Sequence, residues 1–123
     1  MRMGFQLLTI AVLAGLAAPA VAVAQDASAN RAIASHPYAG HISEAANRFG
    51  IPEAWIWAVM RVESAGRRNA VSRAGAMGLM QIMPGTWAQL RVRHRLGSDP
   101  FDPRDNIMAG AAYLRAMYVR YGN

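Results

Sequence analysis

The chain contains no cysteine, and all thirteen of its basic residues are arginine. The lack of cysteine excludes a disulfide framework, a cysteine nucleophile and a thiolate zinc site. The three histidines are scattered, and neither a G-x-S-x-G motif nor a glycine-rich phosphate loop occurs. These absences argue against serine or cysteine nucleophilic catalysis, against a metal site and against nucleotide binding, and we expect no cofactor.

The N-terminal segment is typical of a secretory signal peptide over residues 1–24. Arg2 precedes an uncharged apolar run at 5–18, Pro19 interrupts it, and small residues follow at 20–24. We expect cleavage after Ala24, with Ala22 as the alternative site and an uncleaved anchor as the competing interpretation. The run is shorter than the roughly 20 apolar residues that a membrane span needs. The mature protein is therefore expected in the periplasm or cell envelope, without a membrane span.

After this cleavage, twelve arginines against seven acidic residues leave a net charge of +5. Such a charge suits a polyanionic partner: nucleic acid, an anionic membrane surface or the carboxylate-bearing cell wall. Export argues against nucleic acid. The arginines are scattered and do not form one basic amphipathic helix, which argues against a membrane-active protein.

Helical spacing of apolar residues predicts an all-α domain over residues 38–123, preceded by a flexible lead-in at 25–37. Two early helices are expected, one over 41–49 that ends at Gly50 and one over 54–64 that Pro52 opens. No segment shows the alternation of a β-strand.

Two later helices are also expected. Thr86 is the expected N-cap of the first, and Asp102, followed by Pro103, is the expected N-cap of the second, which Gly122 ends. One face of this last helix is predicted to be buried: Ile107, Gly110, Ala111, Leu114, Met117, Tyr118 and Tyr121.

The apolar stripe of the 54–64 helix ends in a carboxylate. Ile56, Val59 and Met60 are followed, at the next position of the same face, by Glu63. We expect burial and the helix dipole to favour the protonated acid there. The other acids have ordinary explanations in the lead-in, at polar helix positions, in turns and in caps: Asp26, Glu44, Glu53, Asp99, Asp102 and Asp105. The competing interpretation pairs Glu63 with Arg61 or Arg67.

Glu63 also stands apart from the other acids. No Asp or Glu lies between it and Asp99, and Glu44 is the acid that could still reach it through the fold. Most glycosidases place two carboxylates beside the scissile bond. A lone acid instead suits a reaction in which the substrate supplies the nucleophile.

Several stretches around Glu63 resemble the catalytic core of the soluble lytic transglycosylases. They are AVMRVES at 58–64, NAVS at 69–72 and AGAMGLMQIMP at 74–84, with a similar following helix at 102–121. The Glu-Ser pair followed at this distance by Gly-Leu-Met-Gln is specific to that family, and the resemblance covers residues 51–123. It implies a goose-type lysozyme-like helical fold.

The resemblance also implies a chemistry. Glu63 would protonate the glycosidic oxygen between N-acetylmuramic acid and N-acetylglucosamine in peptidoglycan. It would then act as base on the muramyl 6-hydroxyl, giving a 1,6-anhydro sugar. The residues matched to substrate binding are Ser64, Ser72, Gln81 and Met83, of which Ser64 is expected to help hold the following loop.

Family members carry a further helix and an Ala-Tyr-Asn-Ala-Gly motif after the segment that resembles Tyr121-Gly122-Asn123. This sequence stops before that motif, so we expect a C-terminally truncated, unstable or weakly active chain. Two functions stay open. One is an active, monomeric lytic transglycosylase serving a secretion or conjugation apparatus, and the other is a catalytically weak or inactive wall-binding or assembly module of such a system.

Overall fold

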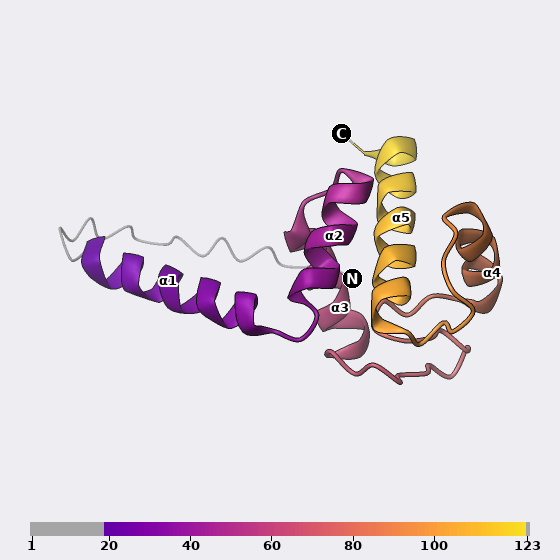
Figure 1. Cartoon of the computed structure of the whole chain (residues 1–123), viewed down its shortest axis with the longest axis horizontal. Helices are drawn as coiled ribbons and strands as arrows, with labels where there is room; N and C mark the ends of the chain where they lie inside the picture. Colours follow the sequence, from indigo (N-terminus) through magenta and orange to yellow (C-terminus); the bar gives the residue numbers. More distant parts are fainter. Residues whose placement is uncertain (1–18, 123) are drawn as a thin grey trace, which may run out of the picture.

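A computed structural model describes residues 19–122, with side chains described from residue 23. The helices are α1 (Pro19–Ser35), α2 (Ala39–Phe49), α3 (Glu53–Ser64), α4 (Pro84–Arg93) and α5 (Pro103–Tyr121) (Figure 1). Between residues 19 and 122, extended pairing is confined to isolated bridges of Met77 with Val71 and with Ile82. The predicted all-α class is confirmed.

The N-terminal helix α1 projects away from the other four helices (Figure 1). Residues 25–35, expected as a flexible lead-in, are helical here, because the segment is rich in alanine, the strongest helix former. Nearly all its side chains are exposed, so it shows none of the periodic burial on which the sequence prediction relied. The first 18 residues of the predicted signal peptide lie outside the described part. None of the described helices is long and apolar enough to cross a membrane.

The helix boundaries follow local sequence signals in most cases. Gly50 ends α2 with φ of 62°, as predicted, and the Asp102 side chain caps α5 by accepting a hydrogen bond from the Asp105 N–H at 3.0 Å. The predicted Thr86 cap is wrong. The helix α4 begins at Pro84, whose fixed φ suits the first helical position, so Thr86 lies inside the first turn.

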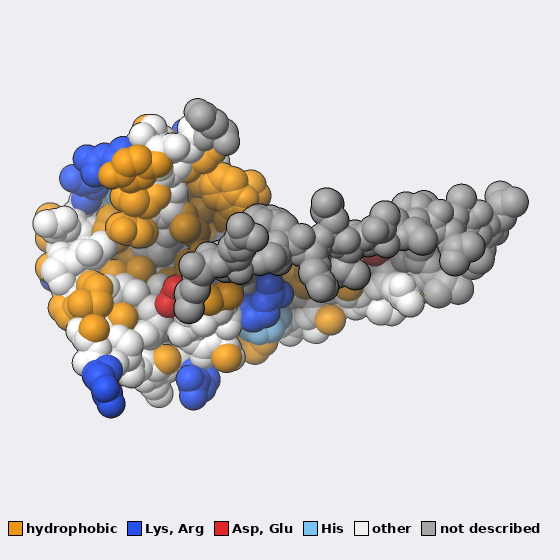
Figure 2. Space-filling model, turned by 180° about the vertical axis from the view of Figure 1, so that it is seen from behind, with side chains coloured by type: hydrophobic (Ala, Val, Ile, Leu, Met, Phe, Trp, Pro, Cys, Tyr) orange, Lys and Arg blue, Asp and Glu red, His pale blue; other side chains and the backbone are white. Residues whose placement is uncertain are grey.

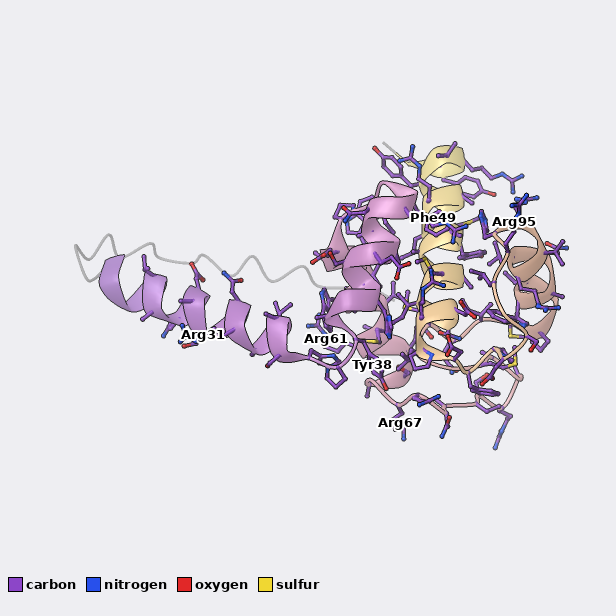
Figure 3. All side chains as sticks on the ribbon, viewed as in Figure 1. Arg31, Tyr38, Phe49, Arg61, Arg67 and Arg95 are labelled. Carbon is purple, nitrogen blue, oxygen red and sulfur yellow. The ribbon has the colours of Figure 1, made fainter. Side chains whose placement is uncertain are left out.

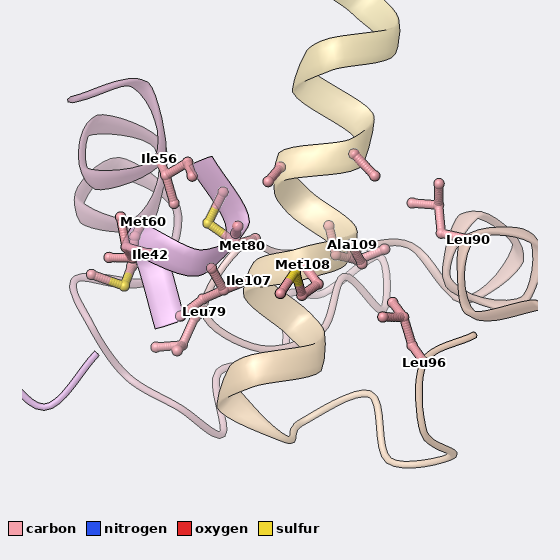
Figure 4. Close-up of a cluster of buried hydrophobic side chains, with 14 of the residues drawn as sticks. Ile42, Ile56, Met60, Leu79, Met80, Leu90, Leu96, Ile107, Met108 and Ala109 are labelled. Carbon is pink, nitrogen blue, oxygen red and sulfur yellow. The ribbon is translucent and has the colours of Figure 1, made fainter. Parts of the chain in front are cut away.

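The hydrophobic core surrounds the first half of α5 (Figure 4). Ile107, Met108 and Ala109 are completely buried there. Side chains from four other regions pack around them: Ile42 on α2, Ile56 and Met60 on α3, Leu79 and Met80 on the intervening loop, and Leu90 and Leu96 on and after α4. The loop approaches α5 at Gly110, where an added Cβ would lie 2.6 Å from the Met80 Cγ. The core therefore fixes the loop at 77–82 against the helices.

The second half of α5 is largely exposed. The predicted face is buried at Ile107, Gly110 and Ala111 and half-buried at Leu114 and Met117. The prediction of burial is wrong for the last two residues of this face, since Tyr118 is 43% and Tyr121 73% exposed. Tyr118 contacts Trp55 of α3 at a ring distance of 5.3 Å, which covers it only in part. Hydrophobic side chains gather on the surface near this end of the chain (Figure 2).

Candidate active site

Two adjoining clefts meet at Glu63 in the last turn of α3. The first, the apolar cleft, has a volume of about 310 Å³ and is lined by Val59, Glu63, Met80, Gln81, Ile82, Met83, Thr86, Gly110, Tyr113 and Leu114. The second, the basic cleft, has a volume of about 650 Å³ and is lined by Glu63, Arg67, Arg68, Asn69, Ala70, Val71, Ser72 and Gln81. Glu63 and Gln81 line both clefts, so the two form one continuous groove.

The side chain of Glu63 is exposed, so the expected burial of this carboxylate is wrong. Its place on the apolar face of α3 was predicted correctly. Only part of that face is in the core, where Met60 is buried, and the rest, with Val59 and Glu63, lines the apolar cleft. Among the described residues the ion pairs are Arg104 with Glu44 and Arg104 with Asp105. Glu63 is thus not neutralised by Arg61 or Arg67, which removes the competing structural interpretation.

Glu63 is the only carboxylate among the residues that line the two clefts. Glu44, the acid that could have reached it, instead joins Arg104, whose Nε donates to its two carboxylate oxygens at 3.2 and 3.1 Å. This hydrogen bond lowers the pKa of Glu44 below its ordinary value. The groove can therefore supply one acid and base.

Ser64 lies beside Glu63 in the chain but lines neither cleft. Its side chain is buried, and its Oγ donates to the Met60 carbonyl at 3.0 Å and accepts from the Gly66 N–H at 3.2 Å. These bonds hold the turn after α3, where Ala65 and Gly66 have φ of 52° and 76°. Ser64 thus fixes the backbone beside the acid, and the structure does not bring its hydroxyl into the groove.

The other three predicted site residues line the groove. Ser72 lies in the basic cleft, where its Oγ accepts from the Ala76 N–H at 2.9 Å. Met83 lines the apolar cleft and is 43% exposed. Gln81 lies between them with φ of 52°, and its Nε2 donates to the carbonyls of Ala70 at 3.1 Å and Gly78 at 3.0 Å. The side chain of Gln81 is thereby held beside Glu63 with its amide oxygen left for a ligand.

Asn106 is a residue of this site to which the sequence analysis assigned no role. It is completely buried; its Oδ1 accepts from the Met80 N–H at 2.7 Å, and its Nδ2 donates to the carbonyls of Met77 at 3.0 Å and Pro100 at 2.8 Å. Gly78 lies against this amide so closely that a Cβ there would collide with the Asn106 Nδ2. Asn106 therefore anchors the segment carrying Gln81 to α5. Its signal in the sequence is a polar residue directly before the uncharged apolar run 107–112.

Tyr113 is a second residue of the groove that the sequence analysis did not select. It lies on α5 just past the buried half, is 44% exposed and lines the apolar cleft together with Glu63. An exposed aromatic ring with a hydroxyl group offers both an apolar face and a hydrogen-bonding tip to a ligand. The groove thus combines an acid, amide and hydroxyl groups, and apolar surface.

Known proteins resemble this chain in sequence. The model of the family described as "Transglycosylase SLT domain" matches residues 40–123. The membrane-bound lytic murein transglycosylase C of Photorhabdus laumondii is 37% identical over 93 residues, and that of Pectobacterium atrosepticum is 37% identical over 98 residues. Each match covers 71% of this chain and 26% of the relative.

Solved structures agree. An inactive mutant of the lytic transglycosylase Slt from Pseudomonas aeruginosa is 34% identical with a TM-score of 0.64, and the match covers 71% of this chain and 15% of that chain. The 70 kDa soluble lytic transglycosylase of Escherichia coli is 35% identical with a TM-score of 0.63, over 70% of this chain and 15% of that one.

The all-α fold around this groove is thus the lysozyme-like fold of the lytic transglycosylases. Within that class, the chain belongs to the transglycosylase SLT domain family. It spans about a quarter of the length of the curated relatives that it matches, 26% in each case.

Proposed function

We propose that this protein is a peptidoglycan lytic transglycosylase that cleaves the β-1,4 bond between N-acetylmuramic acid and N-acetylglucosamine, with Glu63 as its single acid and base. One observation carries the proposal: Glu63 lines both clefts and is the only carboxylate among their lining residues. A glycan strand can cross such a groove with its scissile bond at Glu63. Hydrolysis with paired carboxylates would need a second acid beside it.

The reaction needs one proton-transferring group. The Glu63 carboxyl gives its proton to the glycosidic oxygen as the bond to the muramyl C1 breaks. The resulting carboxylate then takes the proton of the muramyl 6-hydroxyl, whose oxygen bonds to C1. The acid is regenerated, no water is consumed, and the products are a 1,6-anhydromuramyl end and a free N-acetylglucosamine end.

The remaining groove residues position the sugars in this proposal. Gln81 offers its amide oxygen beside Glu63, Ser72 its hydroxyl in the basic cleft, and Met83 its thioether in the apolar cleft. We assign Ser64 an indirect role, because its hydrogen bonds fix the turn that follows the acid. The roles of Gln81, Ser72 and Met83 are supported by their position, because they line the same groove as Glu63.

The names of the relatives support the substrate and the compartment. They are lytic murein transglycosylases, described as membrane-bound in the curated proteins and as soluble in the Escherichia coli structure. We therefore propose that the protein is exported through its signal peptide and acts as a monomer on the cell wall. A secretion or conjugation apparatus that must open the wall is the kind of partner such an activity would serve.

Product analysis tests the proposal. Purified protein is incubated with peptidoglycan sacculi, and the released fragments are identified by mass spectrometry, with Glu63→Gln as the test variant. Glu53→Gln is the matched control, because Glu53 is an exposed acid in the first turn of the same helix. We expect 1,6-anhydromuropeptides from the wild type and the control, and at least ~100-fold less from Glu63→Gln.

Two other outcomes contradict the proposal. Fragments with reducing muramyl ends would identify a hydrolase that uses water as its nucleophile. Wild-type protein that binds sacculi and releases no fragments would identify a wall-binding module.

A further inference from the structure

Two adjacent arginines, Arg67 and Arg68, line the basic cleft together with Glu63 and Ser72. Arg67 lies on the loop that follows α3, across the group of helices α2 to α5 from the C-terminal end of α5 (Figure 3). Both side chains are exposed, so their charges are open to solvent and to a ligand in the cleft. The mechanism proposed above uses neither of them.

The two arginines are not explained by ion pairing within the fold. In the described part of the chain, Arg104 is the arginine that lies within 4.0 Å of a carboxylate. Arg67 donates from its Nε to the Ser64 carbonyl at 3.2 Å, which leaves the two terminal nitrogens of its guanidinium for another acceptor. The cleft thus holds two unpaired positive charges beside a single acid.

The backbone under these arginines is fixed by hydrogen bonds. The Arg67 N–H donates to the Ser64 carbonyl at 3.0 Å, and the Ala70 N–H donates to the Arg67 carbonyl at 3.2 Å. The Gly78 N–H also donates to the Ala70 carbonyl at 2.8 Å, which ties this turn to the segment that carries Gln81. The backbone that carries the two arginines is therefore held at a fixed place relative to the acid.

We propose that Arg67 and Arg68 bind carboxylates of the peptide stem that hangs from the muramyl sugar. The proposal rests on peptidoglycan being the substrate, as proposed above. Guanidinium groups bind carboxylates through paired, charge-assisted hydrogen bonds. The stem is attached to the muramyl unit whose bond is cleaved, so its acidic groups lie near the catalytic acid when the strand occupies the groove. The arginine pair then makes the protein prefer peptide-bearing strands over bare glycan.

Chemical masking of the stem carboxylates gives the test. Sacculi are treated with a carbodiimide and ammonia, which converts free stem carboxylates to amides and leaves the lactyl amide link intact. Binding to native and amidated sacculi is measured in the Glu63→Gln background, so that catalysis does not interfere. We expect amidation to weaken binding roughly three- to tenfold, a range set by two exposed charge pairs. The variant R67Q/R68Q should bind both substrates equally, at the weaker level.

Two further variants separate recognition from folding and from net charge. Arg68→Gln alone leaves the Arg67 bond to Ser64 intact and should show part of the loss. The control R31Q/R95Q removes two exposed arginines that line neither cleft, and it should retain the full difference between native and amidated sacculi. With catalytically active protein, R67Q/R68Q should raise KM and leave kcat nearly unchanged.

The outcomes distinguish the two proposals. If R67Q/R68Q discriminates native from amidated sacculi as well as the protein that keeps both arginines does, the arginine pair does not recognise stems. If both arginine double variants lose affinity equally, non-specific charge attraction explains the binding and the inference is wrong. Failure of the proposed reaction would instead appear as missing anhydromuropeptides from wild-type protein on native sacculi, whatever the binding assay shows.

Discussion

Asn106 shows how a single side chain organises this site. Its amide joins α5 to the backbone of Met77, Met80 and Pro100 by three hydrogen bonds of 2.7 to 3.0 Å, and Asn106 itself is completely buried. An unpartnered buried polar group costs about 1–3 kcal/mol. Asn106→Ala leaves the Met80 N–H and two carbonyls without this partner, so we expect the free energy of unfolding to fall by about 3 kcal/mol or more. Urea denaturation followed by circular dichroism measures the change.

Two further variants define the origin of this effect. Asn106→Asp keeps an acceptor for the Met80 N–H but places a carboxylate oxygen against the Met77 and Pro100 carbonyls in a buried site, so at neutral pH it should be no more stable than Asn106→Ala. Asn47→Ala removes an exposed amide from α2 and should change stability by at most about 0.5 kcal/mol. A stability of Asn106→Ala equal to that of the Asn47→Ala control would show that water replaces the lost bonds.

The sequence identified the acid of the site but not the residue that anchors its surroundings. Glu63 could be selected because a carboxylate interrupts an apolar stripe within one helix, a pattern contained in eight consecutive residues. Asn106 bonds to residues 6, 26 and 29 positions away, and only the tertiary fold brings them together. Exposure of Glu63 was missed for a related reason, since an apolar helix face can continue from a core into a cleft.

At the scale of elements, α2 and α5 pack side by side and are joined at their surface by Glu44 and Arg104. The hydrogen bond from Arg104 lowers the pKa of Glu44 below its ordinary value of 4.5. A carboxyl group with a lower pKa in the folded chain stabilises the fold above its unfolded pKa. This contribution is lost as the pH falls through the folded pKa.

Replacing Glu44 by glutamine should therefore lower the urea midpoint slightly at neutral pH, and the difference should disappear toward about pH 2. The effect is small because the pair is exposed. Denaturation of the wild type, Glu44→Gln, Arg104→Gln and the double variant across this pH range measures it. If the pair is responsible, Glu44→Gln adds little at neutral pH once Arg104 has been replaced, whereas Arg104→Gln also removes the pair with Asp105. If the urea midpoints of the wild type and Glu44→Gln differ by the same amount at acid pH as at neutral pH, this explanation is wrong.

Helix ends were predictable where one residue type determines them. Gly50 allows the positive φ that ends α2, and the Asp102 carboxylate satisfies an N–H in the first turn of α5. Thr86 was mistaken for a cap because Pro84 two residues earlier also starts helices, and both signals fit the sequence. The helix α1 was missed because its stability comes from alanine propensity and not from an apolar stripe.

At the scale of the whole molecule, the groove at Glu63 and the core share one support, the first half of α5. Residues Asn106 to Ala112 are buried, and they contact both the loop that carries Gln81 and the helices α2 and α4. The second half of α5 emerges from this core with apolar side chains still exposed. Hydrophobic surface therefore continues from the apolar cleft along α5, through Tyr113, into a second groove.

This second groove, between α4 and α5, has a volume of about 600 Å³ and adjoins the apolar cleft at Thr86 and Tyr113. Its apolar lining includes Leu90, Met117 and Val119, and Arg93 and Arg120 also line it. An exposed groove of this composition should bind an apolar anion in the folded state. We expect the dye 8-anilinonaphthalene-1-sulfonate to fluoresce when it is mixed with the native protein at neutral pH. With most proteins this dye fluoresces only when the fold has loosened and hydrophobic surface is exposed.

Two valine variants locate the dye. Val119 is 68% exposed in the groove and Val92 is 74% exposed on α4 outside it, so both can be changed to serine at little expected cost in stability. Val119→Ser should weaken dye binding roughly three- to tenfold, because about one apolar side chain's contact is lost, whereas Val92→Ser should leave it unchanged. Equal dye titrations for both variants would place the dye elsewhere. Dye fluorescence that grows with urea before unfolding would show that the native groove is not its site.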